Sequence, residues 1–331
     1  MGIKALLVGI NAYKAGPLNG CVNDIRGIRE VLESQYGLKS GDTRMLLDRD
    51  ATGAQITQGL AWLAEQAKAA ETRTCLFYYS GHGSFTSDQN RDEPDGKDEA
   101  ICPVDYDTKG LLIDDVLHKL YKSFKPSTHL VTVMDSCHSG DSWKAPMDTK
   151  ATDIRAKFIA PPAEELARCR EAALLYKAEK DAMVEDFVRQ KLEGLKKSAG
   201  SPQAMQASIQ TLVKEALLKF QKKSYGMVTA TGNFVLIAGC RSDQTSADAR
   251  FPEGYQGALS YYLLKALRAG GIPTYAALIE KVAEGLDSAG FEQIPQLECT
   301  RALRQTPFLH AVDKTSTSPR AYVDSETAAP H

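Results

Sequence analysis

The first 135 residues alternate between short apolar runs and segments with a helical repeat of apolar positions. The apolar runs, each of strand length, are residues 3–10, 43–47, 74–79, 111–113 and 129–134. The helical pattern covers residues 21–35, 52–70 and 114–124. Strands separated by helical crossovers predict an α/β fold with a parallel sheet and helices on both faces. In such sheets, ligands and catalytic groups lie at the carboxyl ends of the strands.

The pattern changes after about residue 141. A polar stretch runs to Pro162, and two long amphipathic helices are expected at 164–197 and 203–223, with no strand pattern in the region. We interpret this region as a helical insertion without a core of its own. Afterwards the pattern predicts a strand, two helices and a last strand at 233–238, 257–269, 275–284 and 293–297.

Composition narrows the class of protein. The chain has 331 residues, of which 43% are hydrophobic and 25% charged, and this excludes a disordered chain. The net charge of −2 gives no basic field, so we expect no nucleic-acid partner and no membrane partner. No apolar run is long enough to span a bilayer, and MGIKALLVGI lacks the zones of a signal peptide.

The seven cysteines indicate a reducing compartment. Their number is odd, they are scattered, and none forms a CxxC pair. We therefore expect a cytoplasmic protein without a disulfide framework or a zinc cluster, in which most thiols are small core residues.

Two predicted strands end in sequences suited to catalysis, YYSGHG around His82 and DSCHSG around Cys137. The two residues are 55 positions apart, and adjacent parallel strands would bring them to one sheet edge. An imidazole can convert a nearby thiol into the nucleophilic thiolate, and the backbone N–H groups of Cys137 and Gly83 would form an oxyanion hole. Considered alone, a histidine after a strand is more often a turn residue than a catalytic base, and a single cysteine such as Cys137 is more often a buried thiol than a nucleophile. His138 is a rival base, although a sequence neighbour usually points away.

These motifs occur with others in an order that resembles the metacaspases, including their bacterial relatives the orthocaspases, which are caspase-like cysteine peptidases of clan CD. The other motifs are LLVGINAYKAGPLNGCVNDI, DEPDGKDEAICPVD, IAGCRSDQTSAD and QIPQL, and the likeness covers residues 3–142 and 234–298. The resemblance implies a caspase–hemoglobinase fold with a mostly parallel six-stranded sheet and a His82/Cys137 dyad that cleaves peptide bonds. The departures are the helical insertion and DSC in place of the caspase QAC-x-G.

The resemblance also implies a division of the chain. Residues 1–142 match the large-subunit part with the dyad, and residues 227–310 match the small-subunit part that completes the sheet. Residues 143–226 form the insertion between them. The tail at 311–331 is rich in Ser, Thr, Pro and Ala, and we expect it to be disordered.

Charge indicates the substrate. Asp135 precedes the candidate nucleophile by two residues, and Asp24 follows the first strand. Two carboxylates near one thiol repel each other unless a cation joins them, and a substrate Arg or Lys side chain is the natural cation. Asp24 alone is equally explained as an acid at a helix N-terminus. The metacaspase pocket for a basic residue matches Cys21, Asp24, Ser80 and Asp135, so the resemblance implies cleavage after Arg or Lys.

Calcium is a candidate ligand but is not expected to be required. The acidic loop after Asp88 does not fit an EF-hand. In calcium-activated metacaspases the ligands match Asp98, Asp114 and Asp115, but the fourth matching position is Lys144. Its ammonium would repel calcium, unless Asp141 takes its place.

The leading hypothesis is an Arg/Lys-specific cysteine endopeptidase, acting on proteins or peptides as a monomer and cutting itself in the polar stretch after the nucleophile. The candidate self-cleavage residues there are Lys144, Lys150, Arg155 and Lys157. Lys197 and Lys223, at predicted helix ends, are second choices. One alternative is a catalytically silent scaffold that binds a partner. Another is a nucleotide-binding enzyme, which the absence of a GxGxxG or Walker sequence disfavours.

Overall fold

The fold is taken from a computed structural model, which describes residues 2–88, 93–113, 117, 121–125, 127–137, 152–195, 202–224, 233–241 and 244–310. The chain divides into two compact units. The first comprises Met1–Phe85, Glu99–Ala160 and Val228–His331, and the second comprises Thr86–Asp98 and Pro161–Met227.

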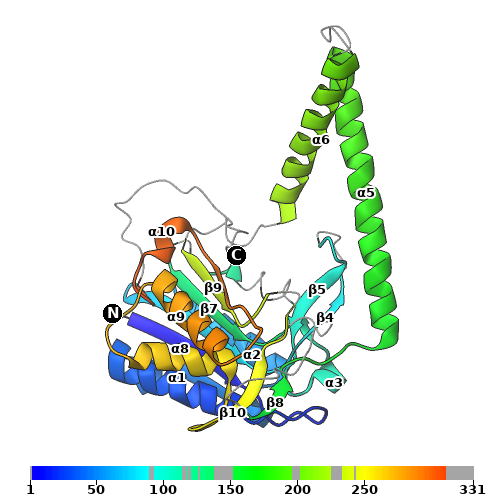
Figure 1. Ribbon diagram of the computed structural model, residues 1–331. Coiled ribbons are helices and arrows are strands. Elements are labelled where there is room, and N and C mark those ends of the chain that lie inside the picture. The colour runs from blue at the N-terminus through cyan, green and yellow to red at the C-terminus, as the bar shows by residue number, and fades with distance from the viewer. Residues whose placement is uncertain are drawn as a thin grey trace. The chain divides into compact units, whose positions relative to one another are not determined.

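A six-stranded sheet forms the centre of the first unit (Figure 1). Its strands, in spatial order, are β12 (Gln296–Glu298), β9 (Phe234–Ala238), β7 (His129–Asp135), β3 (Thr72–Ser80), β1 (Gly2–Gly9) and β2 (Thr43–Leu47). All neighbours pair in parallel except β12, which is antiparallel to β9. The predicted α/β fold with a mostly parallel sheet is therefore confirmed.

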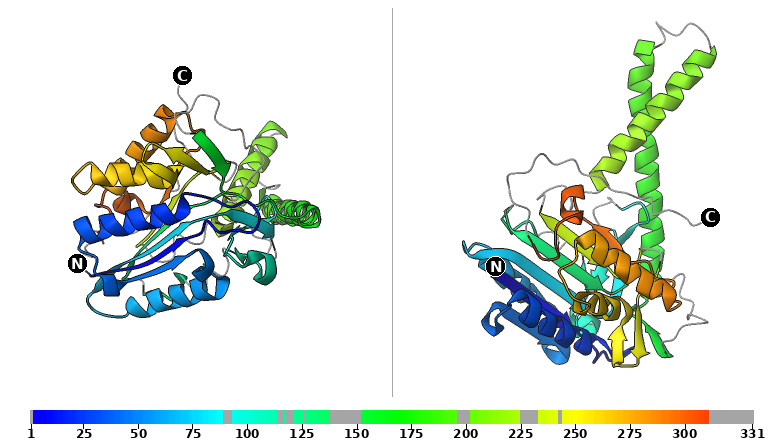
Figure 2. Two further views of the ribbon diagram at one scale, coloured as in Figure 1. Left: turned by 90° about the horizontal axis from the view of Figure 1, so that it is seen from below. Right: turned by 60° about the vertical axis from the view of Figure 1, so that its left-hand side comes forward.

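Helices cover both faces of this sheet (Figure 2). On one face lie α1 (Cys21–Tyr36), α8 (Ala258–Arg268) and α9 (Tyr275–Ser288), whose apolar residues join the sheet in one buried cluster. On the other lies α2 (Gly53–Gln66), whose first turn is capped by Thr52, since the Thr52 side chain accepts a hydrogen bond from the Gln55 N–H. The described part of this unit also contains the short helices η1 (Ser40–Asp42), η2 (Asp48–Asp50), α3 (Tyr106–Lys109) and α10 (Arg301–Arg304).

Two three-stranded sheets flank the edge where β3 and β7 end. One contains β4 (Gly83–Ser87), β5 (Lys97–Ile101) and β6 (Leu112–Ile113). The other contains β8 (Thr152–Ala156), β10 (Ala247–Phe251) and β11 (Gly254–Gly257), all antiparallel. The sequence predicted neither β10 nor β11.

Strand β8 corrects the expectation that the insertion contains no strand. Its sequence, Thr-Asp-Ile-Arg-Ala, has too few apolar residues to resemble a buried strand. It is extended because its backbone pairs with β10, with Ala156 opposite Ala247 and Arg155 opposite Asp248. The hydrogen bonds of β8 come from β10, which is distant in the sequence, so the local sequence of β8 does not predict a strand.

The second unit contains the two expected long helices, α5 (Ala163–Leu195) and α6 (Pro202–Ser224), which pack against each other. Glu165, in the first turn of α5, accepts hydrogen bonds from the Thr86 hydroxyl at 2.8 Å and the Ser87 N–H at 2.7 Å. The end of β4 is thus tied to the first turn of α5. No helix in the described part of the chain is long and apolar enough to cross a membrane.

Candidate active site

The paired strands β3 and β7 bring His82 and Cys137 to one edge of the sheet. Ser80 lies opposite Asp135 in the parallel register, and each candidate catalytic residue lies two positions beyond its strand partner. The Gly81 N–H donates to the Asp135 carbonyl at 3.3 Å, which keeps the two chains together past the sheet. Both side chains are buried, with exposed fractions of 2% for His82 and 0% for Cys137.

The His82 ring is held in one tautomer. Its Nε2 lies 2.6 Å from the Gly16 carbonyl oxygen, which can only accept, so Nε2 carries the proton. The lone pair is therefore on Nδ1, which has no hydrogen-bond partner. Burial lowers the pKa of His82 to about 4, with the hydrogen bond to Gly16 opposing. At neutral pH the imidazole is thus a neutral base with an unoccupied acceptor.

Cys137 is a neutral thiol in this arrangement. Burial, and then its contact with Cys240, raise the pKa of Cys137 well above its usual range. The two Sγ atoms are 3.4 Å apart, and the Ser246 N–H also donates to the Cys137 sulfur. The lowered pKa of His82 and the raised pKa of Cys137 both favour the neutral forms of the imidazole and the thiol.

Two backbone N–H groups converge on one carbonyl beside the thiol. The Lys157 carbonyl oxygen accepts from the Gly83 N–H at 3.0 Å and from the Cys137 N–H at 3.2 Å. These are the two donors predicted for an oxyanion hole. A Cβ at position 83 would collide with the Cys137 backbone, so the approach requires glycine there.

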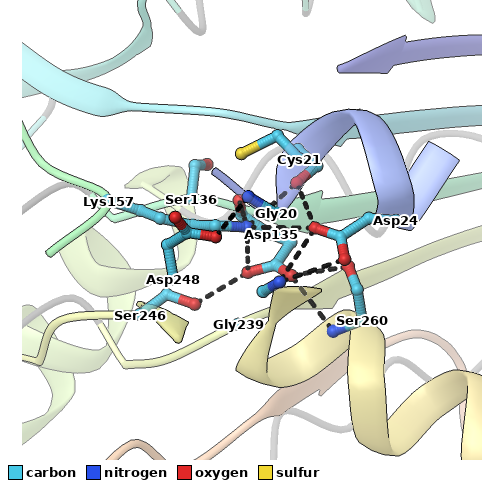
Figure 3. Close-up of polar contacts among 12 residues, drawn as sticks. Gly20, Cys21, Asp24, Asp135, Ser136, Lys157, Gly239, Ser246, Asp248 and Ser260 are labelled. Atoms are coloured by element: carbon cyan, nitrogen blue, oxygen red, sulfur yellow. Dashed lines mark hydrogen bonds and ion pairs between the residues drawn. The ribbon is translucent and has the colours of Figure 1, made fainter. Parts of the chain in front are cut away.

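The Lys157 side chain lies among the residues predicted to bind a basic side chain (Figure 3). Its Nζ is 3.1 Å from Asp135 Oδ1, 3.5 Å from Asp24 Oδ2 and 2.9 Å from Ser80 Oγ. Lys157, Asp24, Asp135, Ser80 and Cys21 are all fully buried. Burial alone would lower the pKa of Lys157, but the acidic groups around it, Asp135 foremost, raise that pKa well above its usual range.

The position of Asp24 fits both explanations given for it, an acid at a helix N-terminus and a carboxylate that faces a cation. It lies in the first turn of α1, where an acid stabilises the helix dipole, and its carboxylate also faces the Lys157 ammonium. Burial raises the pKa of Asp24 to about 7, while the charge of Lys157 opposes this rise and that of Asp135 adds to it.

Three residues hold these two carboxylates in place, one just before β10, one at the end of β11 and one in α8, and sequence reasoning missed this function. Asp135 accepts from the Ser260 hydroxyl at 2.6 Å and from the Ser246 hydroxyl at 2.8 Å. The Gly257 N–H donates to both oxygens of Asp24, each at 3.0 Å. The signal for Ser246 was its place after β9, at the same sheet edge as the dyad. Nothing in the sequence pointed to Gly257 or Ser260.

Gly257 also leaves the space that the lysine fills. A Cβ at this position would overlap both the Asp135 carboxylate and the Lys157 ammonium. The pocket is therefore deep enough for a long basic side chain only because position 257 has no side chain.

The backbone before Lys157 binds as an extended strand. Strand β8 pairs with β10, and the Lys157 N–H donates to the Ser246 carbonyl at 3.0 Å. The Arg155 side chain points elsewhere and donates to the Pro17 carbonyl at 2.7 Å. Of the four candidate self-cleavage residues, the structure thus places Lys157 in the pocket and Arg155 outside it. Lys144 and Lys150 lie outside the described residues.

Of the three predicted calcium ligands, the structure describes only Asp98. Asp98 is buried in the second unit. Asp114, Asp115, Asp141 and Lys144 lie outside the described residues, as does the rival base His138. Among the described residues, no three His, Cys, Asp or Glu side chains are placed to hold a metal ion.

Comparisons with known proteins identify the family of the chain and match its fold. The family model described as "Caspase domain" matches residues 3–306. Metacaspase-1A of Aspergillus niger is 30% identical over 91% of this chain and 70% of its own. Metacaspase-1 of Pyricularia oryzae is 32% identical over 91% of this chain and 72% of its own. The fold matches a solved structure from Geobacter sulfurreducens with a TM-score of 0.59 and 21% identity, over 95% of this chain and 100% of that one.

Proposed function

The chain belongs to the caspase-domain family and is a caspase-family cysteine peptidase, and on this premise we propose that it cleaves peptide bonds after lysine or arginine, first in itself after Lys157. One observation carries the proposal. Residues 152–159 lie in the site as a peptide substrate would, with the Lys157 ammonium between two aspartates and its carbonyl on two N–H donors.

The chemistry follows from the positions of the groups. Cys137 Sγ attacks the Lys157 carbonyl carbon while Nδ1 of His82 takes the thiol proton. The negative charge that develops on the oxygen is stabilised by the Gly83 and Cys137 N–H groups. His82 then gives its proton to the Phe158 nitrogen, the C–N bond breaks, and Lys157 remains as a thioester on Cys137. Water activated by His82 hydrolyses the thioester and restores the thiol.

The uncleaved chain fills its own specificity pocket, because Lys157 occupies the space that a substrate residue needs. Cleavage after Lys157 would separate it from Phe158. The segment that ends at Lys157 could then leave the pocket, and a substrate residue could enter it. Self-processing is then a condition for acting on other proteins. Lysine and arginine both suit the pocket, since each brings a cation on a long stem.

A peptidyl probe with a C-terminal lysine and a thiol-reactive group tests this function. We expect it to label Cys137 in the self-cleaved protein, and the matched probe ending in aspartate to label it far less. A scaffold without activity would show neither self-cleavage nor such selectivity. Cytoplasmic location, the monomeric state and independence from calcium remain predictions.

A further inference from the structure

The residues after Lys157 are also held by specific contacts, from β4. The Gly83 carbonyl accepts from the Ile159 N–H at 3.0 Å, and the Ser84 hydroxyl donates to the Ile159 carbonyl at 2.7 Å. Together with the Gly83 N–H on the Lys157 carbonyl, these bonds bracket Phe158 on both sides. They reach main-chain atoms, which every peptide has, so they position a substrate without selecting its sequence.

A side-chain contact at the same place does depend on sequence. The rings of Phe158 and Phe85 are stacked, with centroids 6.0 Å apart and an interplanar angle of 25°. With Phe158 stacked on it, Phe85 is only 2% exposed, so the two rings share a buried contact. Aromatic pairs at this separation attract each other beyond the burial of their area.

Resting on the proposed function, we propose that Gly83, Ser84 and Phe85 form a binding subsite for the residue that follows the cut, and that this subsite selects an aromatic side chain. The nitrogen that His82 protonates belongs to this residue. Stacking of its ring on Phe85 therefore also fixes the leaving group in the position from which it departs. The preferred substrates are then peptides in which a lysine or arginine is followed by an aromatic residue.

Internally quenched peptides test the subsite on the self-cleaved wild-type protein. The parent peptide has the sequence of residues 153–160, DIRAKFIA, and two others have Leu or Ala in place of the Phe. We expect kcat/KM to fall by about tenfold from Phe to Ala, with Leu between them, since an aromatic pair contributes about a factor of ten or less beyond burial.

Equal rates for the Phe and Ala peptides would overturn the subsite, although cleavage after lysine would still support the proposed function. No cleavage of any peptide would overturn both. The comparison between peptides needs no variant, so it does not depend on the folding of an altered protein.

The variant Phe85→Leu tests whether Phe85 is responsible for the preference for an aromatic residue after the cut. It keeps an apolar side chain but removes the ring, and we expect the ratio of kcat/KM between the Phe and Ala peptides to fall at least about threefold. Phe308→Leu is the matched control, because Phe308 is equally buried but packs against Tyr36 and Tyr275 instead. A ratio that Phe85→Leu leaves unchanged would overturn the assignment to Phe85.

Discussion

The N–H of Cys137 donates a hydrogen bond of 3.2 Å to the carbonyl oxygen of Lys157, so the nucleophile's own backbone holds the peptide group that its sulfur would attack. The Lys157 ammonium is meanwhile fixed 3.1 Å from Asp135, two residues before that nucleophile. Strand β7 thus ends at the carboxylate that contacts the Lys157 ammonium, and the thiol follows two residues later.

Removal of the nucleophile should abolish activity. We expect Cys137→Ala to show no cleavage of a lysine peptide, and His82→Ala to lose roughly three or more orders of magnitude in kcat/KM, because both chemical steps need the imidazole. Cys75→Ala is the control, since this buried thiol lies in β3 near α2. A Cys137→Ala protein that cleaves at the wild-type rate would contradict the assignment.

Neutralising a pocket carboxylate should weaken catalysis on basic substrates. Asp135→Asn keeps the shape of the side chain but removes the charge nearest the ammonium. Losing one partner of a buried charge pair costs about 2–5 kcal/mol, which corresponds to a fall of roughly 30-fold or more in kcat/KM. Steady-state kinetics on lysine and arginine peptides measure this. Efficient cleavage after aspartate by the wild type would contradict the proposed specificity.

The depth of the pocket depends on Gly257. We expect Gly257→Ala to reduce kcat/KM on a lysine peptide by at least about 100-fold, because its methyl group would take the place of the ammonium and displace Asp135. Gly41→Ala is a matched control, since a Cβ there would meet no atom within 4 Å. A Gly257→Ala protein with unchanged KM and kcat would show that the pocket is formed differently.

The pH dependence of kcat/KM should report Asp24. Burial raises the pKa of Asp24 to about 7, and the nearby lysine charge already opposes this rise. The carboxylate binds a cation only when ionised, so kcat/KM should fall as the pH falls through about 7. Arginine and lysine peptides should show the same limb, because both stay charged throughout. A kcat/KM that is constant between about pH 6 and 8 would be inconsistent with this pKa.

The sequence predicted those strands and helices whose own residues form an apolar run or a helical repeat of apolar positions. Strands β1, β3 and β7 are buried on both faces and appear as apolar runs, and the dyad follows directly from where β3 and β7 end. The pocket carboxylates Asp24 and Asp135 were found because two like charges near one thiol need a cation.

Contacts between distant segments could not be predicted. Strand β8 is polar and is extended only because it pairs with β10, which lies about 90 residues later in the chain. Gly257 and Ser260 act through backbone N–H groups, which every residue except proline offers, and through one serine hydroxyl that no local pattern distinguishes from other serines. The sequence also could not show that Lys157, and not Arg155, lies in the site. The pairing of β8 with β10 decides this, because it places the Lys157 carbonyl on the N–H groups of Gly83 and Cys137.

Mass spectrometry of the purified chain after incubation tests the central claim most directly. We expect one fragment of about 17 kDa that ends at Lys157 and one of about 19 kDa that begins at Phe158. These masses divide the 36.1 kDa of the chain in proportion to 157 and 174 of its 331 residues. They should co-elute, because β7 and β9 pair across the cut. Cys137→Ala and Lys157→Met should stay whole, while Lys157→Arg should be cut at the same bond. A wild-type chain cut elsewhere, or a Lys157→Met chain cut like the wild type, would contradict the account.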